Sequence, residues 1–183
     1  MKGPRPNVQM TSFCRLIGLV LVATVLVHAG PAVSESPTRI RPAKVEITGR
    51  GFEIHVMRNK TLAFSSRNYV WSDVPASIDG LRYTRTDGGG TATIHLKAKE
   101  NGEVFVAVVA NSMLDLRELG WTLPVPDRAN TFTYSDQARS LMVIMSQKVT
   151  AGQELDIPQL GFSGTIVLLP TEPESGEPKV FKL

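Results

Sequence analysis

Two apolar stretches decide the fold. Residues 104–110 read VFVAVVA, and residues 141–146 read LMVIMS. A short apolar run that is rich in β-branched side chains favours a strand over a helix, because buried helices are ordinarily about ten residues or longer. We therefore expect both stretches to be buried central strands of a β-structure.

Outward from these stretches, apolar and polar residues alternate with a period of two. The alternation is clearest in residues 52–57 (FEIHVM) and 93–98 (TIHLKA). Because successive strand side chains point to opposite faces, Phe52, Ile54 and Val56 are expected to be buried, and His55 and His95 to face solvent. Further short strands are expected at 45–47, 69–71, 81–84, 131–134, 154–157 and 165–169.

Turn residues separate these strands, as at 87–90 (DGGG) and 100–102 (ENG). Many short strands divided in this way predict an all-β fold, namely an antiparallel, jelly-roll-like β-sandwich. One short helix is expected at 113–119. Ser112 and Asp115 fit a capping box at its start, and Gly120 can end it in the left-handed conformation.

The first 34 residues have the pattern of a secretory signal peptide. Basic residues up to Arg15 precede an apolar run at 16–27, and small residues follow at 27–29 and 32–34. The uncharged run is shorter than the roughly 20 residues that a helix needs to span a bilayer. We therefore expect cleavage, a secreted or periplasmic location, and no stable membrane insertion of the mature protein.

Removal of this leader changes the composition of the chain. Cys14, the only cysteine, lies within it, so the expected mature chain has no disulfide, no Cys-ligated zinc and no thiol nucleophile. The whole chain carries 20 Lys and Arg against 17 Asp and Glu. The leader holds three of the bases and none of the acids, so the mature chain is formally neutral and its charge gives no indication of nucleic-acid binding.

These features divide the chain into four parts. Residues 1–34 are the signal peptide and lead-in, and residues 35–43 are a flexible linker. Residues 44–170 form the β-sandwich domain. Residues 171–183 are an extended tail, because they are acidic and rich in proline.

Few patterns in the sequence indicate catalysis. Residues 161–165 (GFSGT) approach a nucleophile elbow around Ser163, but a strand-like run follows where the elbow requires a helix. Neither His55 nor His95 has a carboxylate at a recognisable metal-site spacing, and a metal site needs three or four ligands. The sequence therefore gives catalysis no positive support and favours a role other than that of an enzyme.

No cofactor is expected either. Asp127 or Asp136 could join backbone carbonyls around a calcium ion. The regularly spaced acidic loop of a known calcium motif is absent from the sequence, so calcium has no positive support.

Aromatic side chains are the remaining candidates for ligand binding, because a sugar ring can stack its C–H face on an aromatic plane. The candidates are Tyr69, Trp71, Trp121 and Tyr134. Large aromatic side chains also dominate sandwich cores, and strand alternation favours a core position for Trp71. Trp121 follows the expected helix, where its ring is either exposed or plugs the end of a sheet.

Three stretches together resemble a known class of module. They are residues 63–71 (AFSSRNYVW), residues 118–121 (ELGW) and residues 151–158 (AGQELDIP). They resemble β-sandwich accessory modules of secreted bacterial polysaccharide-degrading enzymes of the sialidase, esterase and lyase-linked type. The resemblance covers most of residues 44–170 and implies a jelly-roll-like sandwich with an accessory or sugar-binding role.

The sequence thus favours a secreted, non-catalytic module that binds polysaccharide or another extracellular protein. A structural or assembly protein of the cell envelope is the first alternative, because exposed strand edges are templates for pairing. A small hydrolase that uses His55 or His95 is the second alternative.

Overall fold

The computed structural model describes residues 39–88, 91–124 and 130–171, all within the compact unit Glu35–Leu183. The described part is an antiparallel β-sandwich with one short helix, as expected from the sequence. Its elements in chain order are β1 (Val45–Arg50), β2 (Phe52–Val56), β3 (Trp71–Ser72), β4 (Arg82–Thr86), β5 (Thr93–Ala98), β6 (Gly102–Val109), η1 (Ala110–Ser112), α1 (Met113–Glu118), β7 (Thr131–Tyr134), β8 (Leu141–Val149), β9 (Glu154–Ile157) and β10 (Ile166–Leu169).

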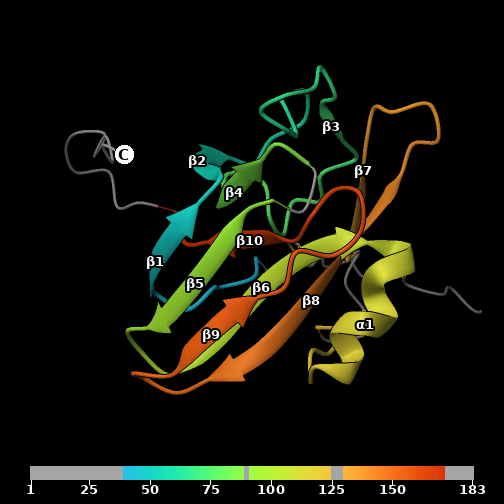
Figure 1. The fold of residues 1–183 in the computed structure, drawn as a ribbon. Helices are drawn as coiled ribbons and strands as arrows, with labels where there is room; N and C mark the ends of the chain where they lie inside the picture. The colour runs from blue at the N-terminus through green and yellow to red at the C-terminus, as the bar shows by residue number, and fades with distance from the viewer. Residues whose placement is uncertain (1–38, 89–90, 125–129, 172–183) are drawn as a thin grey trace, which may run out of the picture. The chain divides into compact units, whose positions relative to one another are not determined.

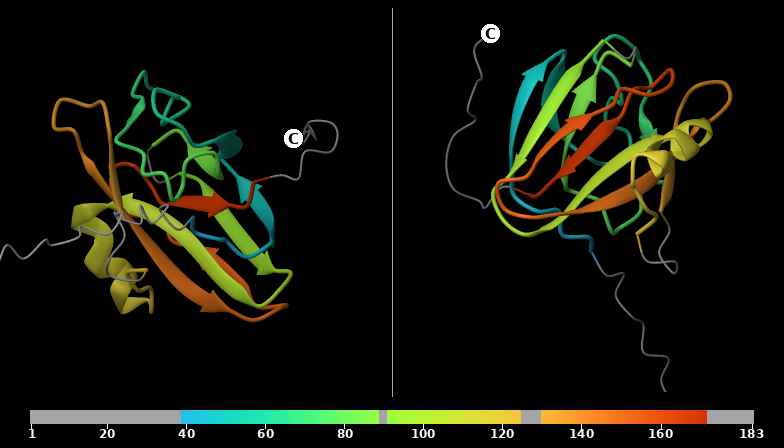
Figure 2. Two further views of the ribbon diagram at one scale, coloured as in Figure 1. Left: turned by 180° about the vertical axis from the view of Figure 1, so that it is seen from behind. Right: turned by 60° about the horizontal axis from the view of Figure 1, so that its bottom comes forward.

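The strands form two sheets of unequal size. The larger sheet has the order β2-β4-β10-β6-β8-β7-β3, and the smaller has the order β1-β5-β9. The smaller sheet lies as a layer against the central strands of the larger one (Figure 1), and the turned views show the same two layers (Figure 2). The chain passes from β1 in one sheet to β2 in the other within one residue, at Gly51.

Gly49 makes this crossing possible. Its φ is +130°, and a Cβ atom there would lie 1.9 Å from the carbonyl oxygen of Thr93 on β5. Only glycine can therefore bring β1 this close to β5 at the point where the chain leaves the smaller sheet.

The pair β6 and β8 lies at the centre of the larger sheet. Its register runs over eight residue pairs, from Gly102 opposite Val149 to Val109 opposite Met142. Phe105 faces one side of the sheet and Val106 the other, and both are buried. The prediction of central strands is confirmed, and the reason that they are apolar throughout is that both faces of the sheet are covered.

Two separate cores cover these faces. The core between the sheets packs Ile94 and Leu96 of β5 against Val106 of β6. The second core lies on the other face, within a curl of the larger sheet. There the ring of Trp71 on β3 lies 5.8 Å from that of Tyr83 on β4, although several strands separate them in the sheet order.

Main-chain hydrogen bonds close the curl. The amide of Met57, just after β2, donates to the carbonyl of Leu81 at 2.7 Å, and that of Lys60 donates to the carbonyl of Trp71 at 2.9 Å. The segment after β2 therefore connects the β4 end of the curled sheet to its β3 end. Beside these bonds, Met57, Phe64 and Ile78 fill the interior of the curl.

The curl corrects one detail of the predicted alternation. Val56 is exposed and Met57 is buried, the reverse of the expectation. Met57 lies on the concave face of the curl, as Glu53 and His55 do. Side chains of the second core cover this face at Met57, whereas Glu53 is exposed.

The helix α1 ends in a Schellman motif. Gly120 has a φ of +87°, the amide of Trp121 donates to the carbonyl of Leu116 at 3.1 Å, and the amide of Gly120 donates to that of Arg117 at 3.0 Å. The motif commonly brings together the two residues that here are Leu116 and Trp121. Both are buried in the core between the sheets.

The start of this helix differs from the prediction. Ser112 makes no side-chain capping bond, because the chain enters α1 through the 3-10 turn η1 and Ser112 is buried within it.

In the part of the chain that the structure describes, no helix has the length and apolar character needed to cross a membrane.

The expected flexible linker is also shorter than predicted. The amide of Ile40 donates to the carbonyl of Ser77 at 3.1 Å, and that of Ala43 donates to the carbonyl of Glu103 at 2.8 Å. Ile40 and Ala43 are buried, so residues 39–43 belong to the folded domain because they cover apolar surface that the strands leave open.

Replacement of Trp71 tests the role of the curl core. Trp71 is fully buried and its ring contacts those of Phe64, Tyr83 and Phe132. We expect Trp71→Ala to lower the free energy of unfolding by about 3–5 kcal/mol, as measured by urea denaturation. Leu114→Ala on the exposed side of α1 should change it by less than about 0.5 kcal/mol. Equal effects of the two variants would contradict the assignment.

Candidate functional site

Three of the four aromatic candidates lie in the cores. Trp71 is 0% exposed, Tyr134 1% and Trp121 4%. Trp71 and Trp121 therefore pack within the cores, whereas the largely buried Tyr134 also borders a hollow at the surface. Tyr69 is half-buried and lies with its ring 5.8 Å from that of Tyr134.

One hollow of the described surface is bordered by an exposed aromatic ring. We call it the Phe162 hollow. It has a volume of about 260 Å³ and lies where β6 ends and β8 begins, beside the turn that precedes β10. Its lining consists of Val109, Ala110, Asn111, Tyr134, Ser140, Leu141 and Phe162.

Phe162 lies in a tightly held turn. Gln159 brackets the turn, since its side-chain oxygen accepts from the amide of Thr165 at 3.2 Å and its side-chain nitrogen donates to the carbonyl of Thr165 at 3.3 Å. The Phe162 residue is 62% exposed. The buried Ser163 follows it and β10 comes next, so this is a strand connection and lacks the helix of a nucleophile elbow.

A guanidinium group supports the exposed ring. The Cζ atom of Arg67 lies 3.8 Å from the ring centroid of Phe162 and 5.7 Å from that of Phe64. Nη2 of Arg67 also donates to the carbonyl of Gly88 at 2.9 Å. Because the cation is fixed by a second bond, it orders the ring of Phe162.

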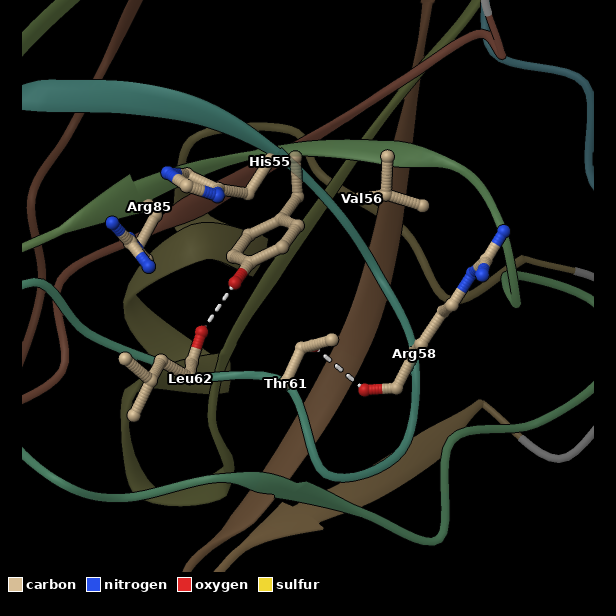
Figure 3. Close-up of a pocket in the computed structure, with 7 residues that line it drawn as sticks. His55, Val56, Arg58, Thr61, Leu62 and Arg85 are labelled. Atoms are coloured by element: carbon tan, nitrogen blue, oxygen red, sulfur yellow. Dashed lines mark hydrogen bonds between the residues drawn. The ribbon is translucent and has the colours of Figure 1, made fainter.

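A second, larger hollow is lined by both polar and apolar side chains, and we call it the arginine hollow (Figure 3). It has a volume of about 410 Å³. It lies at the open side of the curl, where β2 and β4 meet the segment after β2. Its lining consists of His55, Val56, Arg58, Thr61, Leu62, Tyr83 and Arg85.

Strand register brings the polar groups together. In the pair β2 and β4, Glu53 lies opposite Arg85 and His55 lies opposite Tyr83. Because strand side chains alternate, these four residues share one face. Nη2 of Arg85 donates to Oε2 of Glu53 at 2.6 Å, and Nε2 of His55 lies 3.0 Å from the same oxygen.

These two contacts govern the charge on Glu53. The hydrogen bond from Arg85, followed by that with His55, holds the pKa of the Glu53 carboxyl below its usual value of 4.5. A carboxylate therefore accompanies His55, although the sequence shows no metal-site spacing around it. The signal in the sequence is the spacing of two residues between Glu53 and His55, which places both on one face of a strand.

His95 also lies on a strand beside a carboxylate, but in the smaller sheet. It lies on the exposed face of β5 and pairs across the strands with Asp156 of β9. His55 and His95 belong to different sheets. Each therefore has its own carboxylate, and the strand pairing does not bring the two imidazoles together.

Two hydroxyl groups of the arginine hollow are held by hydrogen bonds to the backbone. Oη of Tyr83 donates to the carbonyl of Leu62 at 2.6 Å, and burial raises the pKa of the Tyr83 phenol above 10.0. Oγ1 of Thr61 donates to the carbonyl of Arg58 at 2.8 Å. Both hydroxyls that line the hollow are thus engaged with backbone carbonyls, so neither forms a nucleophile–base pair with His55.

The acidic side chains that were considered as calcium ligands do not form a described metal site. Among residues 39–88, 91–124 and 130–171, no group of three or more His, Cys, Asp or Glu side chains could hold a metal ion. Asp136 accepts hydrogen bonds from the amide and hydroxyl of Ser140, each at 2.7 Å, and so closes its own turn. Asp127 lies outside the described residues.

Comparison with known proteins finds a similar fold. No protein-family model and no curated protein sequence matches the chain. Among solved structures, the chain is similar to a GH138 enzyme targeting pectin rhamnogalacturonan II, with a TM-score of 0.54 and 18% identity. The similarity covers 76% of this chain and 18% of that chain. The fold therefore resembles a part, about a fifth in length, of a polysaccharide-targeting enzyme.

The lowered pKa of Glu53 predicts a pH-dependent contribution to stability. The ion pair should stabilise the fold above about pH 4.5 and be lost as the pH falls through the lowered pKa, because protonation removes the charge. Glu53 is largely exposed, so Glu53→Gln should cost less than about 1 kcal/mol near neutral pH, and this cost should shrink as the pH falls through the lowered pKa. Urea denaturation across this range measures it. A constant difference from the wild type, or an equal effect of Glu118→Gln, would refute the pairing.

Proposed function

We propose that this protein is an exported, non-catalytic β-sandwich module that binds polysaccharide through the Phe162 hollow. The observation that carries the proposal is the exposed ring of Phe162, which Arg67 holds in place at 3.8 Å beside the hollow. A pre-ordered aromatic plane can bind the C–H face of a sugar ring without first losing conformational entropy.

The rest of the hollow has the composition of a sugar-binding surface. Leu141 adds an exposed apolar side chain, and the exposed Asn111 offers an amide that can both donate to and accept from sugar hydroxyls. The Ser140 hydroxyl donates to Asp136 and keeps its lone pairs as acceptors. A largely apolar surface with a few oriented polar groups is typical of small-molecule sites.

The setting supports the same function. The likeness in fold to a part of a GH138 enzyme targeting pectin rhamnogalacturonan II is consistent with a polysaccharide-related role. The basic start, short apolar run and small residues of the first 34 positions support export. Because the hydroxyls in the arginine hollow are engaged, we propose binding in preference to hydrolysis.

Assembly through strand edges has less support. The edge strands of the larger sheet are β2 and the two-residue β3, and the smaller sheet ends in β1 and the four-residue β9. Glu46 on β1 and Glu154 on β9 carry charge along the edges. Short and charged edges are unfavourable templates for pairing with another chain.

Removal of the Phe162 ring tests the proposed site. We expect Phe162→Ala to weaken retention on the polysaccharide that the wild type binds by roughly tenfold, equivalent to about 1.4 kcal/mol. Pull-down on insoluble polymers and a glycan array identify that polysaccharide, and thermal unfolding should remain unchanged. Leu114→Ala is the matched control, because Leu114 is also 62% exposed but lies on α1. No retention of the wild type on any polymer, or full retention of Phe162→Ala, would refute the proposal.

Export predicts a shortened N-terminus. Expression of the full chain in a Gram-negative host should yield a periplasmic or secreted protein that begins at Gly30 or Glu35, the residues after the two small-residue sites. Intact mass spectrometry measures this. A mature protein that still carries the apolar run at 16–27 would show that the segment is not cleaved.

A further inference from the structure

We propose that the arginine hollow is a second binding site, which takes the carboxylate group of an acidic saccharide. The saccharide part of this inference rests on the proposed function, whereas the anion part rests only on the residues of the hollow. Neither part uses Phe162.

The charge balance of the hollow favours an anion. The carboxylate of Glu53 is the partner of both Arg85 and His55, since its Oε2 atom lies within hydrogen-bonding distance of each. No described residue provides a partner for the guanidinium group of Arg58, which is exposed at the hollow. The hollow therefore retains one cation that has no partner among the described residues.

Other cations on the described surface form ion pairs with acidic side chains that the fold places beside them. Nζ of Lys97 lies 3.1 Å from Oε1 of Glu154, and Nη2 of Arg139 lies 2.8 Å from Oδ2 of Asp73. The pairing of Lys97 follows from strand register, because β9 places Glu154 directly opposite it. Arg58 lies in a turn after β2, where no described strand brings an acid opposite it.

The backbone holds Arg58 at the hollow. Its carbonyl accepts from the amide of Thr61 at 3.3 Å and from the Thr61 hydroxyl at 2.8 Å. The next residue, Asn59, accepts from the amide of Val74 through its side-chain oxygen at 3.0 Å. The turn is therefore fixed, while the long side chain remains free to bind.

The guanidinium groups lie on two sides of the hollow. Figure 3 shows Arg85 and His55 on one side and Arg58 on the opposite side, with Leu62 and Thr61 along the lower edge. A planar guanidinium group can donate two parallel hydrogen bonds to a carboxylate, which makes arginine the preferred partner of this anion. A ligand carboxylate can bind Arg58 in this way without displacing Glu53 from Arg85.

Apolar surface beside the cation indicates what carries the carboxylate. Val56 and Leu62 line the hollow and are each 42% exposed. They offer contacts to C–H groups, which a bare sulfate or phosphate ion does not possess. The volume of about 410 Å³ falls in the usual range of small-ligand sites, roughly 300–1,000 Å³. A saturated ring that bears a carboxylate, such as a hexuronic acid, fits both surfaces.

Comparison of an acid with its ester tests the charge. We expect the full-length mature chain to bind an oligogalacturonate at least tenfold more tightly than its methyl ester, measured by isothermal titration calorimetry at low salt. Arg58→Gln should reduce affinity for the acid at least fivefold and leave that for the ester unchanged. Arg117→Gln, which removes an exposed arginine on α1, is the matched control and should bind like the wild type. Added salt should weaken binding of the acid.

Three outcomes would overturn the inference. Equal binding of acid and ester, or wild-type affinity of Arg58→Gln for the acid, would exclude the carboxylate contact. Competition by sodium sulfate at the same concentration as the oligogalacturonate would exclude saccharide recognition, leaving an unselective anion site. Thermal unfolding of Arg58→Gln confirms that the fold is intact, which is expected because its side chain makes no described contact.

The Phe162→Ala variant separates this inference from the proposed function. If the Phe162 hollow binds polysaccharide but the acid binds no better than the ester, the inference fails alone. If Phe162→Ala retains full binding of polysaccharide while Arg58→Gln loses the acid, the proposed site fails and the arginine hollow stands.

Discussion

Pairing of β6 with β8 is the constraint on which the other features depend. The two strands align over eight residue pairs and present apolar side chains to both faces of the larger sheet. A sheet that is apolar on both faces must be covered on both, because each exposed face would cost roughly 25 cal/mol per Å² of apolar surface. The smaller sheet covers one face. The curl of the larger sheet and the segment after β2 cover the other.

This double covering explains where ligands can bind. The aromatic side chains that are best suited to stacking, Trp71 and Tyr134, are used to fill the curl, and Trp121 is turned into the core between the sheets by the Schellman motif. The two hollows that remain accessible lie where the elements that cover the larger sheet meet its strands. One such place exposes Phe162 on its turn, and the other exposes Arg58 beside the open face of β2 and β4.

Much of the fold could be predicted because its signals are local. Each of the ten expected strands overlaps an observed one, and Gly120 ends the helix as expected. The errors occur where residues far apart in the sequence determine whether a side chain is buried. Ile40 is buried by contact with a segment around Ser77, and Met57 is buried by the curl. The candidate sites were harder to predict. Phe162 lay inside a motif considered only for its serine, and Arg58 lay in a turn without a recognised pattern.

By itself, the sequence determined the β-strands, their turns and the absence of cysteine beyond position 14, because alternation, turn residues and composition are properties of neighbouring residues. Only the tertiary structure decided which aromatic rings are buried, because a strand-borne tryptophan has the same local pattern whether its face is covered or open. It also decided that Arg85 shares the face of Glu53 and His55. Strand register between β2 and β4 joins residues about thirty positions apart, and their local sequence does not specify it.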